Sequence, residues 1–148
     1  HQQSRWRLTI GDIREFLGRG RERYDFILVD LEENQSTPMW LTTDEFLTDC
    51  RRRLSPTGVL TLNLIVDNDL STGEALQHIR RVFGPDILLL SEPAHDNLLV
   101  LAFRAGAPAL PSDQVLTALG KRWGIDFHDL AARTTRLGPM TEASDSQA

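Results

Sequence analysis

Two aspartates stand where a carboxylate could do chemistry. Asp30 directly follows the near-continuous apolar run 24–29, which is typical of a strand covered on both faces. Open α/β sheets bind ligands at the carboxyl ends of such strands, so a carboxylate there can act as a general base. Asp12 precedes Glu15 by three residues at an expected helix start, where Asp is also a preferred cap. The plainer interpretations are a strand end for Asp30 and a cap for Asp12.

Other side chains near Asp30 could contact a small ligand. Glu32 and Glu33 lie in the polar loop 31–40, where acidic residues are most often simply solvated. Trp40 follows Pro38 by two residues. It could cover a substrate cleft, although an aromatic ring that packs its own loop is the commoner case.

The remaining candidates for chemistry favour structural roles. Cys50 falls on the apolar face of an expected helix, which predicts a buried, inert thiol. Arginines 51–53 end that helix, where cations suit the helix dipole. The histidines show no metal-ligand spacing, so we expect no metal site; they are His1, His78, His95 and His128.

The composition is that of one globular domain. The chain has 148 residues, of which 41% are hydrophobic, and a net charge of -5. An acidic balance argues against a nucleic-acid partner, and no apolar run is long enough to cross a membrane. The single cysteine fits a reducing compartment, so we expect a cytoplasmic protein. The chain does not begin with methionine, and we expect either a piece of a longer protein or a trimmed one.

The order of expected elements indicates an α/β fold. Capping boxes at Thr42 to Glu45 and Ser71 to Glu74 begin two of the helices, and a third begins at Asp12. Helices between strands predict a mostly parallel sheet, whereas the seven-residue joint 91–97 forces a closing antiparallel hairpin. Two short helices, 112–122 and 126–133, follow. The expected strands are 7–10, 24–30, 59–66, 86–90 and 98–103.

Four segments together resemble a known family. They are 10–17 (IGDIREFL), 24–30 (YDFILVD), 38–46 (PMWLTTDEF) and 54–63 (LSPTGVLTLN). In this order and spacing they resemble the second half of spermidine synthase-like proteins, which have the class I S-adenosylmethionine (SAM) methyltransferase fold. The resemblance implies a three-layer Rossmann-like domain over residues 1–106 whose N-terminal strands are missing. Residues 107–136 would then be a helical extension, and 137–148 a disordered tail.

The resemblance also implies roles for individual residues. Asp12, with Ile13 beside it, would contact the adenine of SAM or decarboxylated SAM. Asp30 would be the catalytic carboxylate that takes the proton of an attacking amine, and Glu33 and Trp40 would contact that small amine substrate. The family usually has a second Asp followed by Pro where this chain has Glu33 and Asn34, so the polyamine specificity is left open.

One expected feature of the cofactor site is missing. The fold usually begins with a strand, a glycine-rich turn and a second strand ending in an acid, but the close pair Gly18 and Gly20 follows a helix and is flanked by arginine. We therefore expect a transferase that is incomplete or inactive as this chain alone. The alternatives are a SAM-dependent methyltransferase on another substrate and a non-catalytic module for assembly or partner binding.

The missing N-terminal strands also bear on whether the chain associates with a second copy of itself. Strands 26–29 and 60–66 are apolar without alternation, so both of their faces need cover. In the family's sheet, strand 25–30 pairs on one side with a strand that this chain lacks, and an exposed apolar edge invites another chain. Either strand 7–10 moves to that edge or a second copy completes the sheet. We expect a homodimer.

Overall fold

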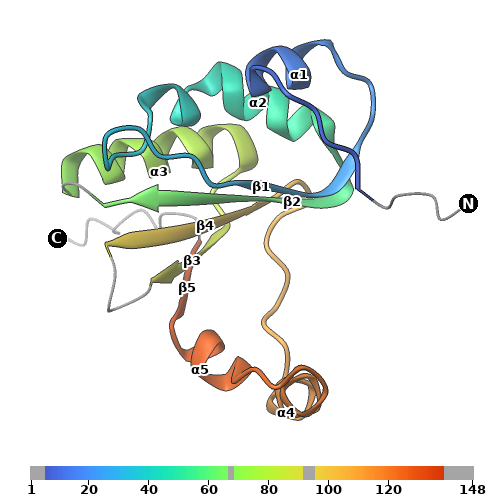
Figure 1. The fold of residues 1–148 in the computed structure, drawn as a ribbon. Helices are drawn as coiled ribbons and strands as arrows, with labels where there is room; N and C mark the ends of the chain where they lie inside the picture. Colours follow the sequence, from blue (N-terminus) through green and yellow to red (C-terminus); the bar gives the residue numbers. More distant parts are fainter. Residues whose placement is uncertain (1–5, 67–68, 92–95, 139–148) are drawn as a thin grey trace, which may run out of the picture.

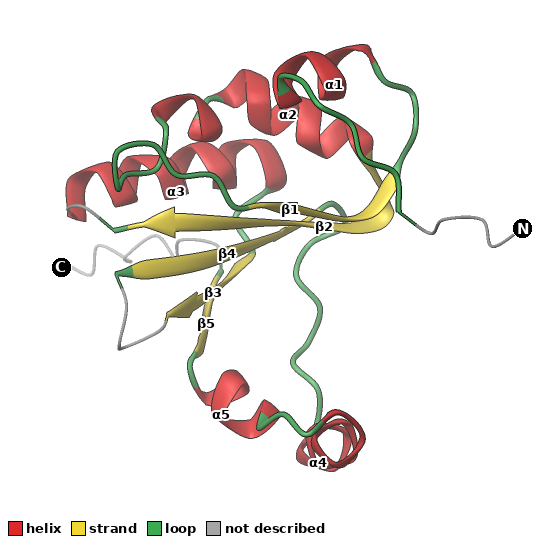
Figure 2. Ribbon diagram, in the orientation of Figure 1, coloured by secondary structure: helices red, strands yellow, loops and turns green. Residues whose placement is uncertain are grey.

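The computed structural model describes residues 6–66, 69–91 and 96–138 (Figure 1). A five-stranded sheet carries three helices on one side, and two short helices lie on the other side (Figure 2). In chain order the elements are α1 (Ile13–Arg19), β1 (Tyr24–Val29), the 3-10 helix η1 (Met39–Thr42), α2 (Asp44–Arg53), β2 (Leu54–Ile65), α3 (Asp69–Phe83), β3 (Ile87–Ser91), β4 (Asn97–Phe103), α4 (Asp113–Trp123), α5 (Phe127–Ala132) and β5 (Thr134–Leu137).

The sheet is mixed, in the order β1-β2-β4-β3-β5. Its α/β class and its closing antiparallel hairpin are as predicted, but β1 and β2 form the one parallel pair among the described strands. Strands β1, β2 and β3 do run in the same direction, as helical crossovers require. The return strand of the hairpin, β4, lies between β2 and β3, so most neighbours are antiparallel.

The predicted strand 7–10 is wrong. These residues have no strand pairing, and the side chains of Leu8 and Ile10 are 87% and 92% exposed. Strand β1 is consequently the edge of the described sheet. The segment 7–10 has strand-like composition, but it has not moved to that edge, so the backbone groups on the free side of β1 have no strand partner.

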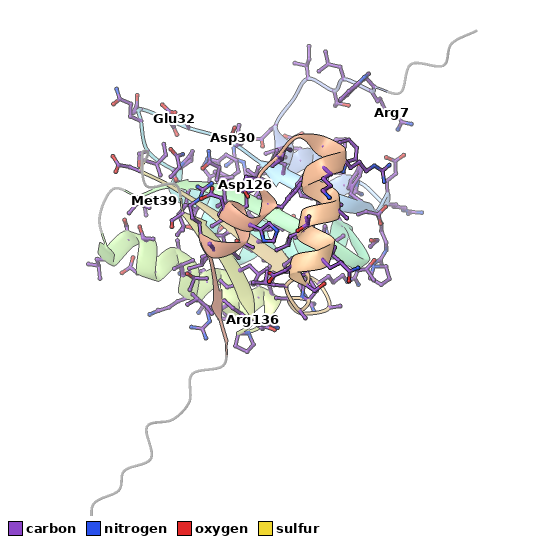
Figure 3. All side chains as sticks on the ribbon, turned by 90° about the horizontal axis from the view of Figure 1, so that it is seen from below. Arg7, Asp30, Glu32, Met39, Asp126 and Arg136 are labelled. Carbon is purple, nitrogen blue, oxygen red and sulfur yellow. The ribbon has the colours of Figure 1, made fainter. Side chains whose placement is uncertain are left out.

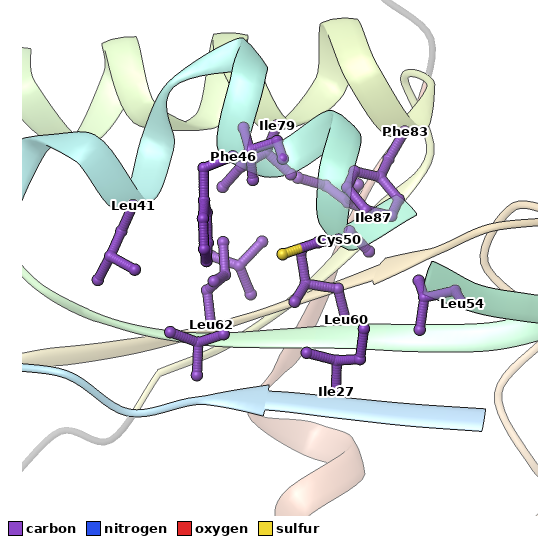
Figure 4. Packing of buried hydrophobic residues seen from close by; sticks show 14 of the residues in the cluster. Ile27, Leu41, Phe46, Cys50, Leu54, Leu60, Leu62, Ile79, Phe83 and Ile87 are labelled. Carbon is purple, nitrogen blue, oxygen red and sulfur yellow. The ribbon is translucent and has the colours of Figure 1, made fainter. Parts of the chain in front are cut away.

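The core lies between the sheet and helices α1 to α3. Figure 4 shows its part beneath α2 and α3. Residues alternate along β1, so Ile27 and Val29 point into this core and are 8% and 2% exposed. They sit beside Leu60 and Leu62 of β2, and Phe46, Leu47 and Cys50 of α2 lie above them. The buried set also includes Leu17, Leu41, Leu54, Leu64, Ile79, Phe83, Ile87, Val100 and Ala102.

The opposite face of β1 is open. Phe26 and Leu28 point away from the helices and are each 56% exposed. Helices α4 and α5 lie on this side of the sheet, where α5 adjoins β5 at the far edge (Figure 1). The third layer expected from the sequence is therefore not filled over β1 in the described part of the chain.

Helix α2 begins one residue later than its capping box predicts. The Phe46 N–H donates to Thr43 Oγ1 at 3.4 Å, so Thr43 is the N-cap. Thr42 ends η1 instead, and its hydroxyl donates to the Met39 carbonyl at 3.2 Å. The 3-10 turn after Pro38 thus uses the residue that the motif assigns to the cap. Helix α3 begins at residue 69, two residues before Ser71, and Asp12 caps α1 as predicted.

We expect Thr43→Ala to destabilise the protein by about 1 kcal/mol, because it removes an N-cap acceptor. Thr42→Ala, the matched control one residue away, should cost less because no helix N–H depends on that hydroxyl. Urea unfolding of the two variants compares their free energies of unfolding. Equal losses of unfolding free energy, or a larger loss for Thr42→Ala, would indicate that Thr42 is the N-cap, as predicted from the sequence.

The C-terminal extension is helical only in part. Helices α4 and α5 match the predicted ones closely, but residues 134–137 form β5, which pairs antiparallel with β3. Arg136 anchors this strand: it binds Asp86 at 2.5 Å and donates to the carbonyl of Ala107 at 2.8 Å. The predicted helical extension therefore ends in a strand, and Leu137, predicted to begin the tail, belongs to that strand. Residues 139–148 of the predicted tail lie outside the described residues.

Candidate active site

A chain of polar side chains crosses the carboxyl ends of β1 and β2. Asn63 Nδ2 donates to Asp30 Oδ1 at 2.9 Å, and Asn97 Nδ2 donates to Asn63 Oδ1 at 2.9 Å. The three residues come from the ends of β1, β2 and β4, which the sheet places side by side. Asp30 itself is exposed, so its second carboxylate oxygen can accept a proton or a hydrogen bond from a ligand.

These polar residues lie on the open face of the sheet. Ile27 and Val29 point to the helices, so alternation puts Asp30 on the same side as Phe26 and Leu28. Asn63 likewise alternates with the buried Leu62 and Leu64. The candidate base thus faces the side of the sheet that helices α1 to α3 do not cover.

The loop after β1 turns tightly beside this carboxylate. Glu33 and Ser36 exchange two backbone hydrogen bonds, of 2.9 and 3.1 Å. Asn34 and Gln35 have φ of 52° and 60°, which is the geometry of a turn that favours Asn and Gly. The Ile65 N–H donates to Thr37 Oγ1 at 2.7 Å and ties the loop to the end of β2. The turn fixes the backbone of Glu33, whereas its side chain is exposed and has no partner among the described residues of the site.

Arg14 bridges Asp12, the predicted cofactor-binding residue, and the Trp40 ring. The Arg14 guanidinium binds the Asp12 carboxylate at 2.6 Å and lies 4.9 Å from the centre of the Trp40 ring. The hydrogen bond from Arg14 holds the pKa of Asp12 below its usual range, with the neighbouring positive charge adding to it. Trp40 also packs edge-on against Phe46 at 5.2 Å. Ile13 is half-buried against the core, so Asp12 is the more accessible of the pair.

A pocket of about 420 Å³ opens on the helix side of the same end of the sheet. Its wall combines the loop after β1, η1 and the N-cap of α2 with the end of β2 and residues 71–78 of α3, and it holds hydroxyl groups, one carboxylate and one imidazole. His78 Nδ1 lies 2.7 Å from Asp44 Oδ1 nearby. The polar lining residues are Ser36, Thr37, Thr42, Thr43, Ser71, Thr72, Glu74 and His78.

The structure brings the predicted residues together in two groups. Asp30 and Glu33 share the loop after β1, while Asp12 and Trp40 share Arg14; no contact joins Asp30 to Asp12. Asn63 and Asn97 were not predicted as site residues. The signal for Asn63 was present, because it is the one amide in the mostly apolar run 59–66. Asn97 begins β4, and its contact with Asn63 depends on strand pairing that sequence alone does not give.

Cys50 is buried, as predicted, with 0% of its surface exposed. Burial raises the pKa of its thiol to about 12, so the thiolate is a very small fraction at pH 8. We therefore expect Cys50 to react negligibly with a thiol reagent in the folded protein at pH 8 and rapidly in urea. Rapid modification of the folded protein would contradict this burial.

Two kinds of site are not found among the described residues. No group of three or more His, Cys, Asp or Glu side chains there could hold a metal ion. Among the helices of that same part, none is long and apolar enough to cross a membrane. His1 and His95 lie outside the residues described.

The fold and the placement of the polar chain define a class of protein. The sheet and its crossovers match human methyltransferase-like protein 13 in complex with SAH, with a TM-score of 0.65 at 22% identity, over 79% of this chain and 57% of that one. They also match a probable spermidine synthase from Corynebacterium glutamicum, with a TM-score of 0.64 at 19% identity, over 88% of this chain and 47% of that one. The protein has the fold of class I SAM-dependent methyltransferases.

Sequence relatives narrow the class. The chain is 31% identical over 121 residues to a polyamine aminopropyltransferase of Chromobacterium violaceum, covering 79% of this chain and 46% of the relative. It is 27% identical over 142 residues to the same enzyme of Neisseria meningitidis, covering 91% of this chain and 52% of the relative. No family model matches the sequence. The protein is spermidine synthase-like, as predicted, and spans about half the length of these curated relatives.

Proposed function

We propose that this chain carries the amine-activating half of a polyamine aminopropyltransferase-type active site. The observation that supports the proposal most is the Asp30 carboxylate, held by Asn63 at the carboxyl end of β1 with its second oxygen exposed. The curated relatives are named for aminopropyl transfer to polyamines. The proposal includes the cytoplasmic location expected from the sequence.

The chemistry assigned to this chain is the handling of the amine. A protonated amine is not a nucleophile, so a base must take its proton before it attacks. In this proposal Asp30 is that base, which is supported by the hydrogen bond from Asn63 to one carboxylate oxygen, because it fixes the direction of the other. Asn97 in turn orients the Asn63 amide, since it donates to the Asn63 carbonyl oxygen. Glu33, on the exposed turn that follows, can attract the distal ammonium of a polyamine.

The described residues do not by themselves fit a sulfonium nucleoside. Asp12 is already paired with Arg14, and no strand in the described ranges leads into a glycine-rich turn. Two of the structural neighbours are complexes with small ligands: methyltransferase-like protein 13 with SAH, and a spermidine synthase with the transition-state analogue AdoDATO. We assign donor binding to the half of the relatives that has no counterpart in this chain.

We expect this chain alone to bind SAM and decarboxylated SAM weakly or not at all. Losing a glycine-rich turn and a ribose-binding acid removes much of the binding energy, and each 1.4 kcal/mol is about tenfold in affinity. Isothermal titration calorimetry with each nucleoside measures this. Low-micromolar binding to the isolated chain would show that its residues form the donor site unaided.

The proposed function is tested by complementation. The part of the Chromobacterium relative that lies outside the matched region would be co-expressed with this chain, and the pair would be assayed with decarboxylated SAM and a series of aliphatic diamines. Aminopropyl transfer that requires both parts supports the proposal. Methyl transfer from SAM would favour the methyltransferase alternative, for which the fold match to methyltransferase-like protein 13 is the specific observation. A folded, SAM-binding pair without transfer of either group would favour the non-catalytic module.

We also propose that the chain associates through β1. This strand is the free edge of the described sheet, and its open face exposes Phe26 and Leu28. Two copies related by a two-fold axis can pair their β1 edges antiparallel and bring these four side chains together. Light scattering at micromolar concentration should then give twice the chain mass, whereas a stable monomer would reject the homodimer.

A further inference from the structure

A buried arginine lies at the end of α2 opposite to the candidate active site. Arg53 is 3% exposed, although it is the last of three consecutive arginines. It falls on the same helix face as Phe46 and Cys50, so the helical period turns it into the protein. The sequence predicted a cation that suits the helix dipole at this end of α2, which the structure bears out, but it did not predict that Arg53 is buried.

The guanidinium of Arg53 has few hydrogen-bond partners. Its Nε and Nη1 atoms are buried and have no partner, while Nη2 donates to the Tyr24 hydroxyl at 3.3 Å. The rings of Phe16 and Tyr24 lie 5.8 and 5.4 Å from it, which stabilises a cation but satisfies no N–H group. None of the described ion pairs includes Arg53. An arginine stays charged, so this arrangement is costly unless an anion completes it.

The same guanidinium lines a wide hollow rich in arginine. The hollow has a volume of about 1240 Å³, and its rim consists mostly of exposed side chains, including Phe16 at 42% exposure. Five arginines and three carboxylates line it, which makes it locally positive in a chain whose net charge is -5. The charged residues are Arg7, Asp12, Glu15, Arg19, Arg21, Glu22, Arg23 and Arg53.

This hollow is separate from the Asp30 carboxylate, although Asp12 is among the residues that line it. Tyr24, beside Arg53, begins β1, and Asp30 directly follows the end of that six-residue strand. At about 3.3 Å per residue, the two ends are roughly 20 Å apart. Figure 3 shows Arg7, on the rim of the hollow, well apart from Asp30 and Glu32. A ligand in the hollow would therefore not be the amine that Asp30 handles.

We propose that this hollow binds a phosphate-type oxyanion against Arg53. Arginine pairs with phosphate oxygens through charge-assisted hydrogen bonds, and Nε and Nη1 are the donors that lack a partner here. Because both atoms are buried, the anion reaches them only when side chains around the guanidinium shift; the Phe16 ring, 5.8 Å from it, is an exposed neighbour. Arg21, exposed on the rim, supplies a second positive charge, so pyrophosphate should bind more tightly than phosphate.

The test measures anion binding to this chain and to three variants. Calorimetry and thermal unfolding would be run with phosphate, pyrophosphate and acetate at equal ionic strength set with chloride. Arg53→Met keeps the apolar stem and removes the charge. Gly20→Ala keeps the charge but displaces it, because the new Cβ would lie 2.0 Å from Arg53 Nη1. Arg51→Met, an exposed site on the same helix, is the matched control.

We expect phosphate and pyrophosphate to raise the melting temperature of the unmodified chain more than acetate does. Arg53→Met should weaken binding by about tenfold to a hundredfold, Gly20→Ala should weaken it as well, and Arg51→Met should not. Without anion, Arg53→Met should melt at the same or a higher temperature, since it removes a buried unpaired charge. Equal phosphate binding by Arg53→Met, or equal stabilisation by acetate, would overturn the proposal. So would the absence of any anion effect.

Discussion

Asp30→Asn should reduce turnover by about a hundredfold or more in the complemented enzyme, because it removes a general base. The substitution is nearly isosteric, and the new side-chain oxygen can still accept from Asn63 Nδ2, so the fold and the melting temperature should change little. Steady-state rates with decarboxylated SAM and the best diamine measure the loss. A partial recovery at higher pH, where more of the amine is already neutral, would identify the lost step as proton removal.

Asp25→Asn is the matched control for this effect. Asp25 lies on the same strand, and its carboxylate accepts from Ser55 Oγ at 2.6 Å, at the end of β1 away from Asp30. Its replacement should leave turnover unchanged. If Asp30→Asn were as active as Asp25→Asn, Asp30 would be a strand end with no part in the chemistry.

Leu60→Ala should lower the free energy of unfolding by about 2–5 kcal/mol. Leu60 lies in the middle of β2, is 0% exposed and contacts the core between β1 and α2. The neighbouring side chains come from a sheet and from helices that are fixed to it, so the cavity closes only in part. Urea unfolding followed by circular dichroism measures the change.

Leu28→Ala is the informative comparison. The same atoms are removed from the adjacent strand, but Leu28 is on the open face and is 56% exposed. In a monomer the loss should be well under half of that at Leu60, because less apolar area returns to water. A dimer that covers Leu28 would raise the loss and make it dependent on protein concentration. A large loss that is independent of concentration would contradict the open face.

The positions of the helices and strands could be predicted well from local sequence patterns. Which strands lie side by side in the sheet could be predicted less well. Apolar runs and turn residues located β1 to β4 and α1 to α5, because burial and backbone geometry act within a few residues. Strand pairing joins distant segments, so the insertion of β4 between β2 and β3 followed from no local pattern. Segment 134–137 has only Leu137 as a large apolar residue, and it forms β5 because β3 offers a free edge.

The candidate site residues show the same difference between local patterns and contacts made across the fold. The position of Asp30 at the end of an apolar strand and that of Asp12 at a helix start could be predicted from the sequence. The partners of these carboxylates come from other elements: Asn63 and Asn97 for Asp30, and Trp40 through Arg14 for Asp12. Arg53 shows what composition alone misses. A run of three arginines suggests exposed side chains, whereas the helical period turns the third one into the protein.

The two edge strands of the sheet differ in whether they can pair with a further strand. Strand β5 is short, and Arg136 within it binds Asp86, features that discourage the addition of a further strand. Strand β1 has no such protection in the described chain. Fibrous growth by edge pairing needs two receptive ends, and this sheet presents one. Addition at β1 therefore terminates after a single step, so misassembly of this chain by strand exchange should yield closed pairs rather than fibrils.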